Sequence, residues 1–186
     1  MSLIGQSVTI IGAGVAGLAA ARALALRGAA VTVLEQADAI REVGAGLQIS
    51  PNGAVVLREL GLQAELDAAS MRAEAVQLID GPTGDGVTRL DLARLRPGQG
   101  YHFLHRADLI ELLLKGARSA GVTLHLLSRI SEVDLTGPVP ALVLESGERF
   151  AAPLLIGADG LHSRVRAALT GPEHPFFTHP VAWRAV

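Results

Sequence analysis

The sequence predicts an α/β fold, in which a parallel sheet with a βαβ unit is joined to strands of a second, incomplete antiparallel sheet. Three observations support this fold class. A strand, a glycine-rich loop, a helix and a second strand follow one another at the N-terminus. A small antiparallel meander is expected over residues 130–151, and short strands that break the βαβ rhythm lie between residues 74 and 104. Alternating strands and helices are typical of parallel sheets, whereas consecutive strands favour antiparallel pairing.

The N-terminal series begins with residues 8–11, which are apolar and mostly β-branched. Such a short stretch is typical of a strand that is covered on both faces. Residues 15–27 are rich in alanine and leucine and predict a helix, and Gly28 stands where a C-terminal cap belongs. Residues 31–34 predict a second buried strand. The two strands should be parallel, because a helix connects them.

The following segment is expected to be a loop and two helices. Residues 36–50 predict a loop. Ser50 is a good N-cap and Pro51 suits the first turn, so a helix should begin there and end near Gly61. Residues 63–69 predict a shorter helix.

A hairpin is expected next, because two apolar runs flank a turn rich in glycine and proline. The runs are residues 76–79 and 87–92, and the turn is residues 81–86. Residues 101–104 predict another short strand. These strands do not continue the βαβ rhythm, so we assign them to a second sheet or subdomain.

The second half of the chain returns to alternating elements and adds the meander. The expected elements are a helix over 107–119, a strand over 122–127, meander strands over 130–135, 141–145 and 149–151, a buried strand over 154–156 and a helix over 162–169. Residues 181–184 look like the beginning of one more strand.

Composition excludes several classes of protein. The chain has 186 residues, no cysteine, and 16 Lys+Arg against 18 Asp+Glu. It therefore has no disulfide framework, no thiolate metal site and no cysteine nucleophile, and it lacks the basic excess of a nucleic-acid binder. No Gly-x-Ser-x-Gly motif supports a serine hydrolase. The six histidines lack an accompanying carboxylate cluster, so we expect no metal site.

The chain is expected to be soluble and cytoplasmic, without a membrane partner. Its longest apolar stretch, residues 15–26, is interrupted by Arg22 and is shorter than the roughly 20 residues of a membrane-spanning helix. Arg22 is also the first cation, so the N-terminus lacks the basic region of a signal peptide.

A glycine motif follows the first predicted strand and opens the first helix. Residues 12–17 read Gly-Ala-Gly-Val-Ala-Gly, which fits the G-x-G-x-x-G pattern of Rossmann-like nucleotide-binding folds. Gly12 permits the tight turn, Gly14 lets the backbone approach a pyrophosphate, and Gly17 lets the helix pack closely on the strand. The N–H groups at the start of the helix, including those of Val15 and Ala16, then face the phosphates.

An acidic residue stands at the end of the second strand, where a ribose is expected. Glu35 would accept hydrogen bonds from a ribose diol and would repel a 2′-phosphate, which favours FAD or NAD over NADP. Gln36 follows it and is included in the predicted site. The alternative is a glycine turn that merely packs a helix on a sheet, with Glu35 simply exposed.

Four further segments, in order along the chain, resemble one family. Residues 41–52, 101–109, 155–166 and 181–184 are similar to segments of group A flavoprotein monooxygenases, the FAD-dependent aromatic hydroxylases of the salicylate hydroxylase and 6-hydroxynicotinate 3-monooxygenase type. The resemblance implies a Rossmann-like FAD-binding domain and part of an antiparallel substrate domain. The FAD-binding domain would comprise residues 1–73 and 105–175, and the partial substrate domain residues 74–104 and 176–186.

The resemblance implies two arginines and one backbone contact for the cofactor. Arg106 matches the arginine that reaches the FAD pyrophosphate, and a guanidinium can fork two phosphate oxygens. Arg41 matches a second cofactor-contacting arginine. Ile130 falls where the family holds adenine by its backbone. For Arg106 the alternative is an ordinary surface pair with Asp108.

The remaining positions that match the family lie around the flavin ring and the pyrophosphate. Gly46 and Leu47 would place backbone near the flavin, and Gln48 would point toward the substrate side of the ring. Asp159 and Gly160 match a motif used near the pyrophosphate and for NAD(P)H, although an Asp-Gly pair is also an ordinary turn.

The activity that the resemblance implies is hydroxylation of a small aromatic acid or phenol, with NADH or NADPH reducing FAD and O2 as co-substrate. Relatives continue with most of the substrate sheet and a second Gly-Asp motif, whereas the only Gly-Asp here, Gly84-Asp85, lies in the predicted hairpin turn. We therefore expect an N-terminal part that is inactive alone and that associates as a homo-oligomer or with a missing C-terminal half. Two alternatives are a non-catalytic nucleotide-binding remnant or assembly partner, and an NAD-dependent dehydrogenase.

Overall fold

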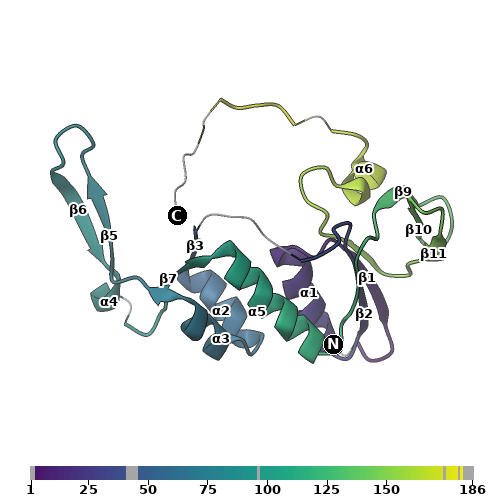
Figure 1. Cartoon of the computed structure of the whole chain (residues 1–186), viewed down its shortest axis with the longest axis horizontal. Coiled ribbons are helices and arrows are strands. Elements are labelled where there is room, and N and C mark those ends of the chain that lie inside the picture. The colour runs from purple at the N-terminus through teal and green to yellow at the C-terminus, as the bar shows by residue number, and fades with distance from the viewer. Residues whose placement is uncertain (1–2, 41–45, 96, 174, 180, 182–186) are drawn as a thin grey trace. The chain divides into compact units, whose positions relative to one another are not determined.

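The computed structural model describes residues 3–40, 46–95, 97–173, 175–179 and 181 (Figure 1). These residues form two compact units. The first falls within Met1–Glu42 and Leu113–Trp183, and the second within Val43–Leu112. Among the described residues, no helix is both long enough and apolar enough to cross a membrane.

The first unit is built on a four-stranded parallel sheet. Its strands are β1 (Ser7–Ile11), β2 (Ala30–Leu34), β8 (Thr123–His125) and β12 (Leu155–Gly157), in the order β12-β1-β2-β8. Helix α1 (Val15–Ala25) connects β1 to β2, so the predicted parallel βαβ unit is confirmed. After this helix Gly28 adopts a φ of +92°, a conformation that glycine reaches without strain.

A small meander completes the first unit. Strands β9 (Ile130–Asp134), β10 (Ala141–Leu144) and β11 (Arg149–Ala151) pair antiparallel in the order β11-β10-β9, and α6 (Arg164–Thr170) follows β12. One apolar cluster joins the meander and α6 to the carboxyl ends of the central strands. Its buried members are Ile11, Leu34, Ile130, Leu142, Ala152 and Val165.

The second unit has its own antiparallel sheet. Strands β3 (Gly46–Ile49), β7 (His102–His105) and β4 (Met71–Arg72) pair in the order β3-β7-β4. The chain also forms α2 (Pro51–Glu59) and α3 (Gln63–Ala69) here. Helix α5 (Arg106–Ser119) begins immediately after β7 and continues into the first unit.

A separate hairpin belongs to the second unit. Strands β5 (Ala75–Ile79) and β6 (Gly86–Asp91) form a two-stranded antiparallel sheet, and the short helix α4 (Leu92–Leu95) follows. Val76 is opposite Leu90, whereas the neighbouring Gln77 is opposite Arg89. The face that carries Val76, Leu78 and Leu90 is therefore mainly apolar, whereas the face that carries Gln77 and Arg89 is mixed.

The fold class is confirmed, but one local prediction is wrong. Residues 46–49 lie in the segment predicted to be a loop, yet they form β3, because β7 supplies an antiparallel partner more than 50 positions away. The strand predicted over 101–104 forms β7, which lies in the second unit with the hairpin but pairs with β3 and β4. Pairing between distant segments leaves no local signal in a loop rich in glycine.

Two further predictions are changed or lie partly outside the described residues. The strand predicted over 122–127 is confined to β8, because the chain turns away after His125. In the tail, residues 176–179 and 181 belong to no helix or strand, and residues 182–184 lie outside the described residues. The predicted division into an FAD-binding and a substrate domain stays a prediction, since the two compact units group the chain differently.

Candidate functional site

The glycine loop between β1 and α1 is packed against the segment that follows β12. Gly12 has a φ of +99°, and a Cβ on it would lie 2.4 Å from the carbonyl oxygen of Ala158. A Cβ on Gly17 would lie 1.9 Å from the carbonyl oxygen of Gly12. The packing of the chain itself therefore requires glycine at both positions, as predicted for the tight turn and for the close approach of helix and strand.

Gly14 differs from its two neighbours in the motif. Its φ of −74° suits any residue, and a Cβ on it would meet no heavy atom within 4 Å. It is the N-cap of α1 and has no side chain that could cap the helix. The packing of the chain does not require glycine at this position. A side chain here would occupy the open space beside the start of α1.

The start of α1 offers hydrogen-bond donors beside that space. Within the described part of the chain, the N–H groups of Val15, Ala16 and Gly17 make no hydrogen bond. The first such bond in the helix joins the Leu18 N–H to the Gly14 carbonyl oxygen at 3.0 Å. Free N–H groups and the positive end of the helix dipole together favour an anion such as a phosphate.

Glu35 is directed toward the glycine loop. Its Oε2 accepts a hydrogen bond from the Ala13 N–H at 2.7 Å, and its Oε1 accepts one from the Ala37 N–H at 2.9 Å. The side chain is half-buried rather than simply exposed. A carboxylate has about four lone-pair positions, so Glu35 retains acceptor capacity for a ribose diol.

The segment after β8 lies beside Glu35 and leads to Ile130. The Glu35 N–H donates to the His125 carbonyl oxygen, and the Ser128 N–H donates to the Glu35 carbonyl oxygen, both at 2.8 Å. Ile130 turns its side chain into the core. It could therefore contact adenine only through its backbone, which is the contact that the resemblance implies.

The predictions did not include Leu127, which lies in this segment. It adopts a left-handed φ of +54° and is 75% exposed. Its N–H donates to the Ala37 carbonyl oxygen at 3.0 Å. Because Ala37 is two positions after Glu35, this exposed apolar residue lies near Glu35. No sequence signal could have found it, because leucine rarely adopts this conformation. Gln36 is exposed in the same region.

Asp159 caps helix α6. Its Oδ1 accepts from the Ser163 hydroxyl at 2.6 Å, and its Oδ2 accepts from the Arg164 N–H at 2.7 Å. Gly160 has a φ of +78°, so the pair also forms a glycine-dependent turn. A Cβ on Gly12 would lie 3.2 Å from the Asp159 Cα, which places this turn directly against the glycine loop.

The structure thus gathers most of the predicted cofactor residues at the carboxyl end of the parallel sheet. Open doubly wound sheets bind nucleotides at this end. The gathered residues are Gly12, Gly14, Val15, Ala16, Gly17, Glu35, Gln36, Asp159 and Gly160.

Four other predicted residues lie in the second unit. Gly46, Leu47 and Gln48 are on β3, and Arg106 is the first residue of α5. Gly46 is opposite His105 in the β3–β7 ladder, so β3 begins beside the start of α5. Arg41 lies outside the described residues.

A tyrosine that was not predicted holds Gln48. The Tyr101 hydroxyl donates a hydrogen bond to Gln48 Oε1 at 2.8 Å, and the Tyr101 ring lies 5.8 Å from the Phe103 ring, centroid to centroid. With its oxygen engaged, the Gln48 amide presents its NH2 group as a donor. Strand pairing brings these residues together, and so the sequence alone did not reveal the contact.

The described residues contain no cluster of three or more metal-ligating side chains. His102 is the first residue of β7 and is buried, whereas His105 is the last residue and is exposed.

The chain belongs to the FAD-binding domain family of the group A flavin monooxygenases, and the family match covers residues 6–182. The glycine loop at the carboxyl end of the parallel sheet, with Glu35 directly after the second strand, agrees with that membership.

Relatives of known activity cover nearly the whole chain. It is 35% identical to 6-hydroxynicotinate 3-monooxygenase of Bordetella bronchiseptica over 182 residues, 96% of this chain and 47% of that protein. It is 31% identical to 3-hydroxybenzoate 6-hydroxylase 1 of Aquipseudomonas alcaligenes over 97% of this chain and 47% of that protein. The chain therefore spans just under half the length of these relatives.

A solved structure shows the same fold. The tetrameric form of 2-methyl-3-hydroxypyridine-5-carboxylic acid oxygenase matches with a TM-score of 0.78 and 29% sequence identity. The match covers 89% of this chain and 42% of that one.

Proposed function

We propose that the chain binds FAD through the glycine loop of the first unit and forms the dinucleotide-binding part of an aromatic hydroxylase. The observation that carries this proposal is Gly14, where the fold leaves open a space that a side chain would fill. The N–H groups at the start of α1 would hold the pyrophosphate, and Glu35 the adenosine ribose.

Further contacts would come from the residues that match the family pattern. Arg106 and Arg41 would neutralise pyrophosphate charge, and the backbone of Ile130 would contact adenine. Gly46 and Leu47 would lie near the flavin ring. Bound FAD would supply the redox chemistry, and the protein would orient the ring and exclude water.

We infer the substrate class from the relatives. Their names give 6-hydroxynicotinate and 3-hydroxybenzoate, which are both aromatic rings that carry a carboxylate and a hydroxyl group. We propose such a small aromatic acid or phenol as the substrate, with NADH or NADPH as reductant and O2 as oxidant. The NH2 group of Gln48 would then donate a hydrogen bond on the substrate side of the flavin.

A matched pair of glycine variants tests the FAD site. Gly14→Ala should leave stability nearly unchanged and weaken FAD binding about tenfold or more, because its methyl group would occupy the space next to the pyrophosphate. Gly81→Ala is the control, since its Cβ would also meet no atom within 4 Å and Gly81 lies in the hairpin turn. FAD affinity is measured by fluorescence titration, and retention by flavin absorbance that co-elutes with the protein in gel filtration.

The outcomes separate the roles. Equal FAD affinity in Gly14→Ala and wild type would show that the glycine loop does not bind FAD. Arg106→Ala should also weaken retention, and unchanged affinity in that variant would remove its assigned contact. A folded wild-type chain that retains no FAD would mean that the additional length found in relatives is needed to hold the cofactor.

A second candidate function is a non-catalytic nucleotide-binding remnant or assembly partner. It would need only the nucleotide-binding features of the first unit, namely the glycine loop and Glu35. The discriminating measurement is NAD(P)H oxidation with FAD supplied, with and without a hydroxybenzoate. Stimulation by the aromatic acid favours the hydroxylase, and its absence in an FAD-binding protein favours the assembly partner. NAD binding stronger than FAD binding would favour a dehydrogenase instead.

A further inference from the structure

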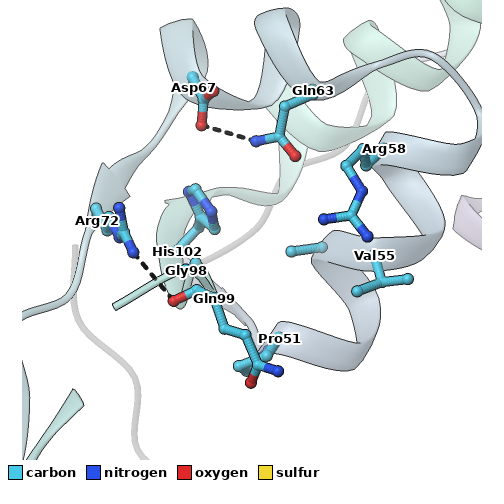
Figure 2. Close-up of a pocket in the computed structure, with 11 residues that line it drawn as sticks. Pro51, Val55, Arg58, Gln63, Asp67, Arg72, Gly98, Gln99 and His102 are labelled. Carbon is cyan, nitrogen blue, oxygen red and sulfur yellow. Dashed lines mark hydrogen bonds between the residues drawn. The ribbon is translucent and has the colours of Figure 1, made fainter. Parts of the chain in front are cut away.

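The second unit contains a pocket of about 320 Å³ that has no part in the proposed FAD site (Figure 2). Helices α2 and α3, strands β4 and β7 and residues 98–100 line it. Pro51, Ala54 and Val55 of α2 form an apolar wall. Arg58 and Arg72 supply positive charge, and in Figure 2 they lie on opposite sides of His102.

His102 is a buried histidine whose tautomer the structure defines. It is only 3% exposed, and its Nδ1 lies 2.9 Å from the Ser70 hydroxyl oxygen. That hydroxyl donates its single proton to the Leu66 carbonyl oxygen at 2.5 Å. The Ser70 oxygen must therefore accept from His102 Nδ1–H, which leaves Nε2 as a bare hydrogen-bond acceptor in the neutral ring.

The acceptor opens into the pocket. Nε2 makes no hydrogen bond within the described part of the chain. No fully buried side-chain nitrogen or oxygen among those residues lacks a hydrogen-bond partner, so Nε2 is not fully buried. A Cβ on Gly100 would lie 2.0 Å from Nε2, and both residues line the pocket. The absence of a side chain at Gly100 is therefore what keeps the lone pair accessible.

The neutral ring is consistent with its surroundings. Burial lowers the pKa of His102 below its ordinary value of 6.5, and the charge of Arg72 lowers it further, while that of Asp67 raises it. The pocket thus has a neutral acceptor beside charged groups.

The charged lining favours an anion. Within the described residues Arg58 pairs only with the adjacent Glu59, with 3.7 Å between Nε and Oε1. Arg72 is held in place by the carbonyl oxygens of Pro97 and Gln99, at 2.7 and 3.2 Å. Asp67 opposes an anion, but it accepts a hydrogen bond from the Gln63 amide at 2.9 Å. Two guanidinium groups against one carboxylate leave the lining positive.

We propose that this pocket is an accessory binding site for a hydroxylated aromatic carboxylate. The ligand hydroxyl donates to His102 Nε2, the ligand carboxylate pairs with Arg58 and Arg72, and the ring lies on the apolar wall of α2. The site lies wholly within the second unit, so it does not require bound FAD.

The test is calorimetric titration of the FAD-free chain with 3-hydroxybenzoate, with benzoate and phenol as comparison ligands. The hydroxy acid should bind about fivefold or more tightly than either, because each comparison ligand lacks one of the two polar contacts. The proposal is overturned if 3-hydroxybenzoate does not bind, or if benzoate binds equally well.

Glycine variants locate the bound probe. Gly100→Ala places a methyl group against Nε2 and should weaken binding about fivefold or more, whereas Gly81→Ala, in the hairpin turn and outside the pocket lining, should not, because its Cβ meets no atom within 4 Å. Arg58→Gln should also weaken binding, and this exposed substitution decides the question if Gly100→Ala fails to fold. Unchanged affinity in Arg58→Gln places the probe elsewhere and overturns the proposal.

The Gly14→Ala variant separates this site from the FAD site. It should bind 3-hydroxybenzoate as wild type does while losing FAD affinity. Joint loss of both ligands in a folded Gly14→Ala protein would contradict an independent site, and loss of FAD alone leaves this proposal intact.

Discussion

The parallel sheet and the β5–β6 hairpin use the same kinds of side chain with opposite results. Val8, Ile10 and Val33 in the parallel sheet are all 0% exposed, whereas Leu78 in the hairpin is 57% exposed and Val87 61%. Aliphatic strand residues are therefore buried only where other elements cover both faces of the sheet. An isolated hairpin is marginally stable in water, since it has too little apolar contact to offset the entropy of ordering.

The difference predicts where the stability of the chain resides. The first unit covers its sheet with helices and a meander, and its core cluster continues to the residues of the glycine loop. The apolar face of the hairpin has no such cover among the described residues. Most of the predicted cofactor-site residues thus lie in the same unit as this core.

The largest expected effect comes from truncating matched aliphatic residues in the two regions. Ile10→Ala should lower the free energy of unfolding by about 2–5 kcal/mol, because it removes fully buried methyl groups and leaves a cavity. Leu78→Ala should change it by less than about 0.5 kcal/mol, because that side chain is largely in water already. Urea unfolding followed by circular dichroism measures both. Equal costs would show that the hairpin is covered in solution.

Self-association should show a smaller effect. Exposed apolar side chains on an uncovered strand favour contact between chains, so we predict that the wild-type chain associates. Leu78→Lys should weaken association about tenfold, equivalent to about 1.4 kcal/mol, while Gln77→Lys on the opposite face of β5 serves as the control. Sedimentation equilibrium gives both constants. A monomeric wild-type chain with a sharp cooperative melt would contradict the prediction.

The smallest effect concerns pH and the second unit. Burial lowers the pKa of folded His102 below 6.5, the charge of Asp67 raises it in part, and that of Arg72 lowers it. As the pH falls through 6.5, the unfolded chain takes up this proton before the folded chain does. The free energy of unfolding should therefore decrease as the pH falls from 6.5 through the lowered pKa, and this contribution is fully present above 6.5.

NMR titration of the His102 ring measures this pKa directly. The chain unfolded in urea provides the reference value. A folded-state pKa at or above the reference would show that the ring is not desolvated as the structure describes.

The comparison also separates what was predictable in the site. The local motif around Gly12 and Gly17 was predictable. The close contact at Gly17 lies within one strand–loop–helix unit, whereas that at Gly12 is with Ala158, far away in the sequence. Glu35 was predictable by its place at the end of a strand, but its hydrogen bond to the Ala13 N–H was not. The role of each residue toward FAD stays a prediction, and Gly14 offers the clearest test.

The second unit was less predictable for a physical reason. The sequence predicts a loop where β3 forms, and it gives no signal for the contact of Tyr101 with Gln48. Both features depend on pairing across more than 50 residues. The Ser70–His102 contact that defines the histidine tautomer joins the end of α3 to β7 in the same way. Such contacts depend on which segments meet, and local propensity does not encode that choice.

The sequence by itself determined the α/β class, the βαβ unit and the glycine motif, since each is encoded in short periodic segments or spacings read along the chain. The family was indicated by the resemblance of four segments to known relatives. Only the tertiary structure decided that β7 joins β3, that Asp159 caps α6 against the glycine loop, and that the Ser70 hydroxyl meets Nδ1 of His102. Those features depend on the distances between atoms far apart in sequence. Burial and hydrogen bonding fix these distances only when the whole chain packs.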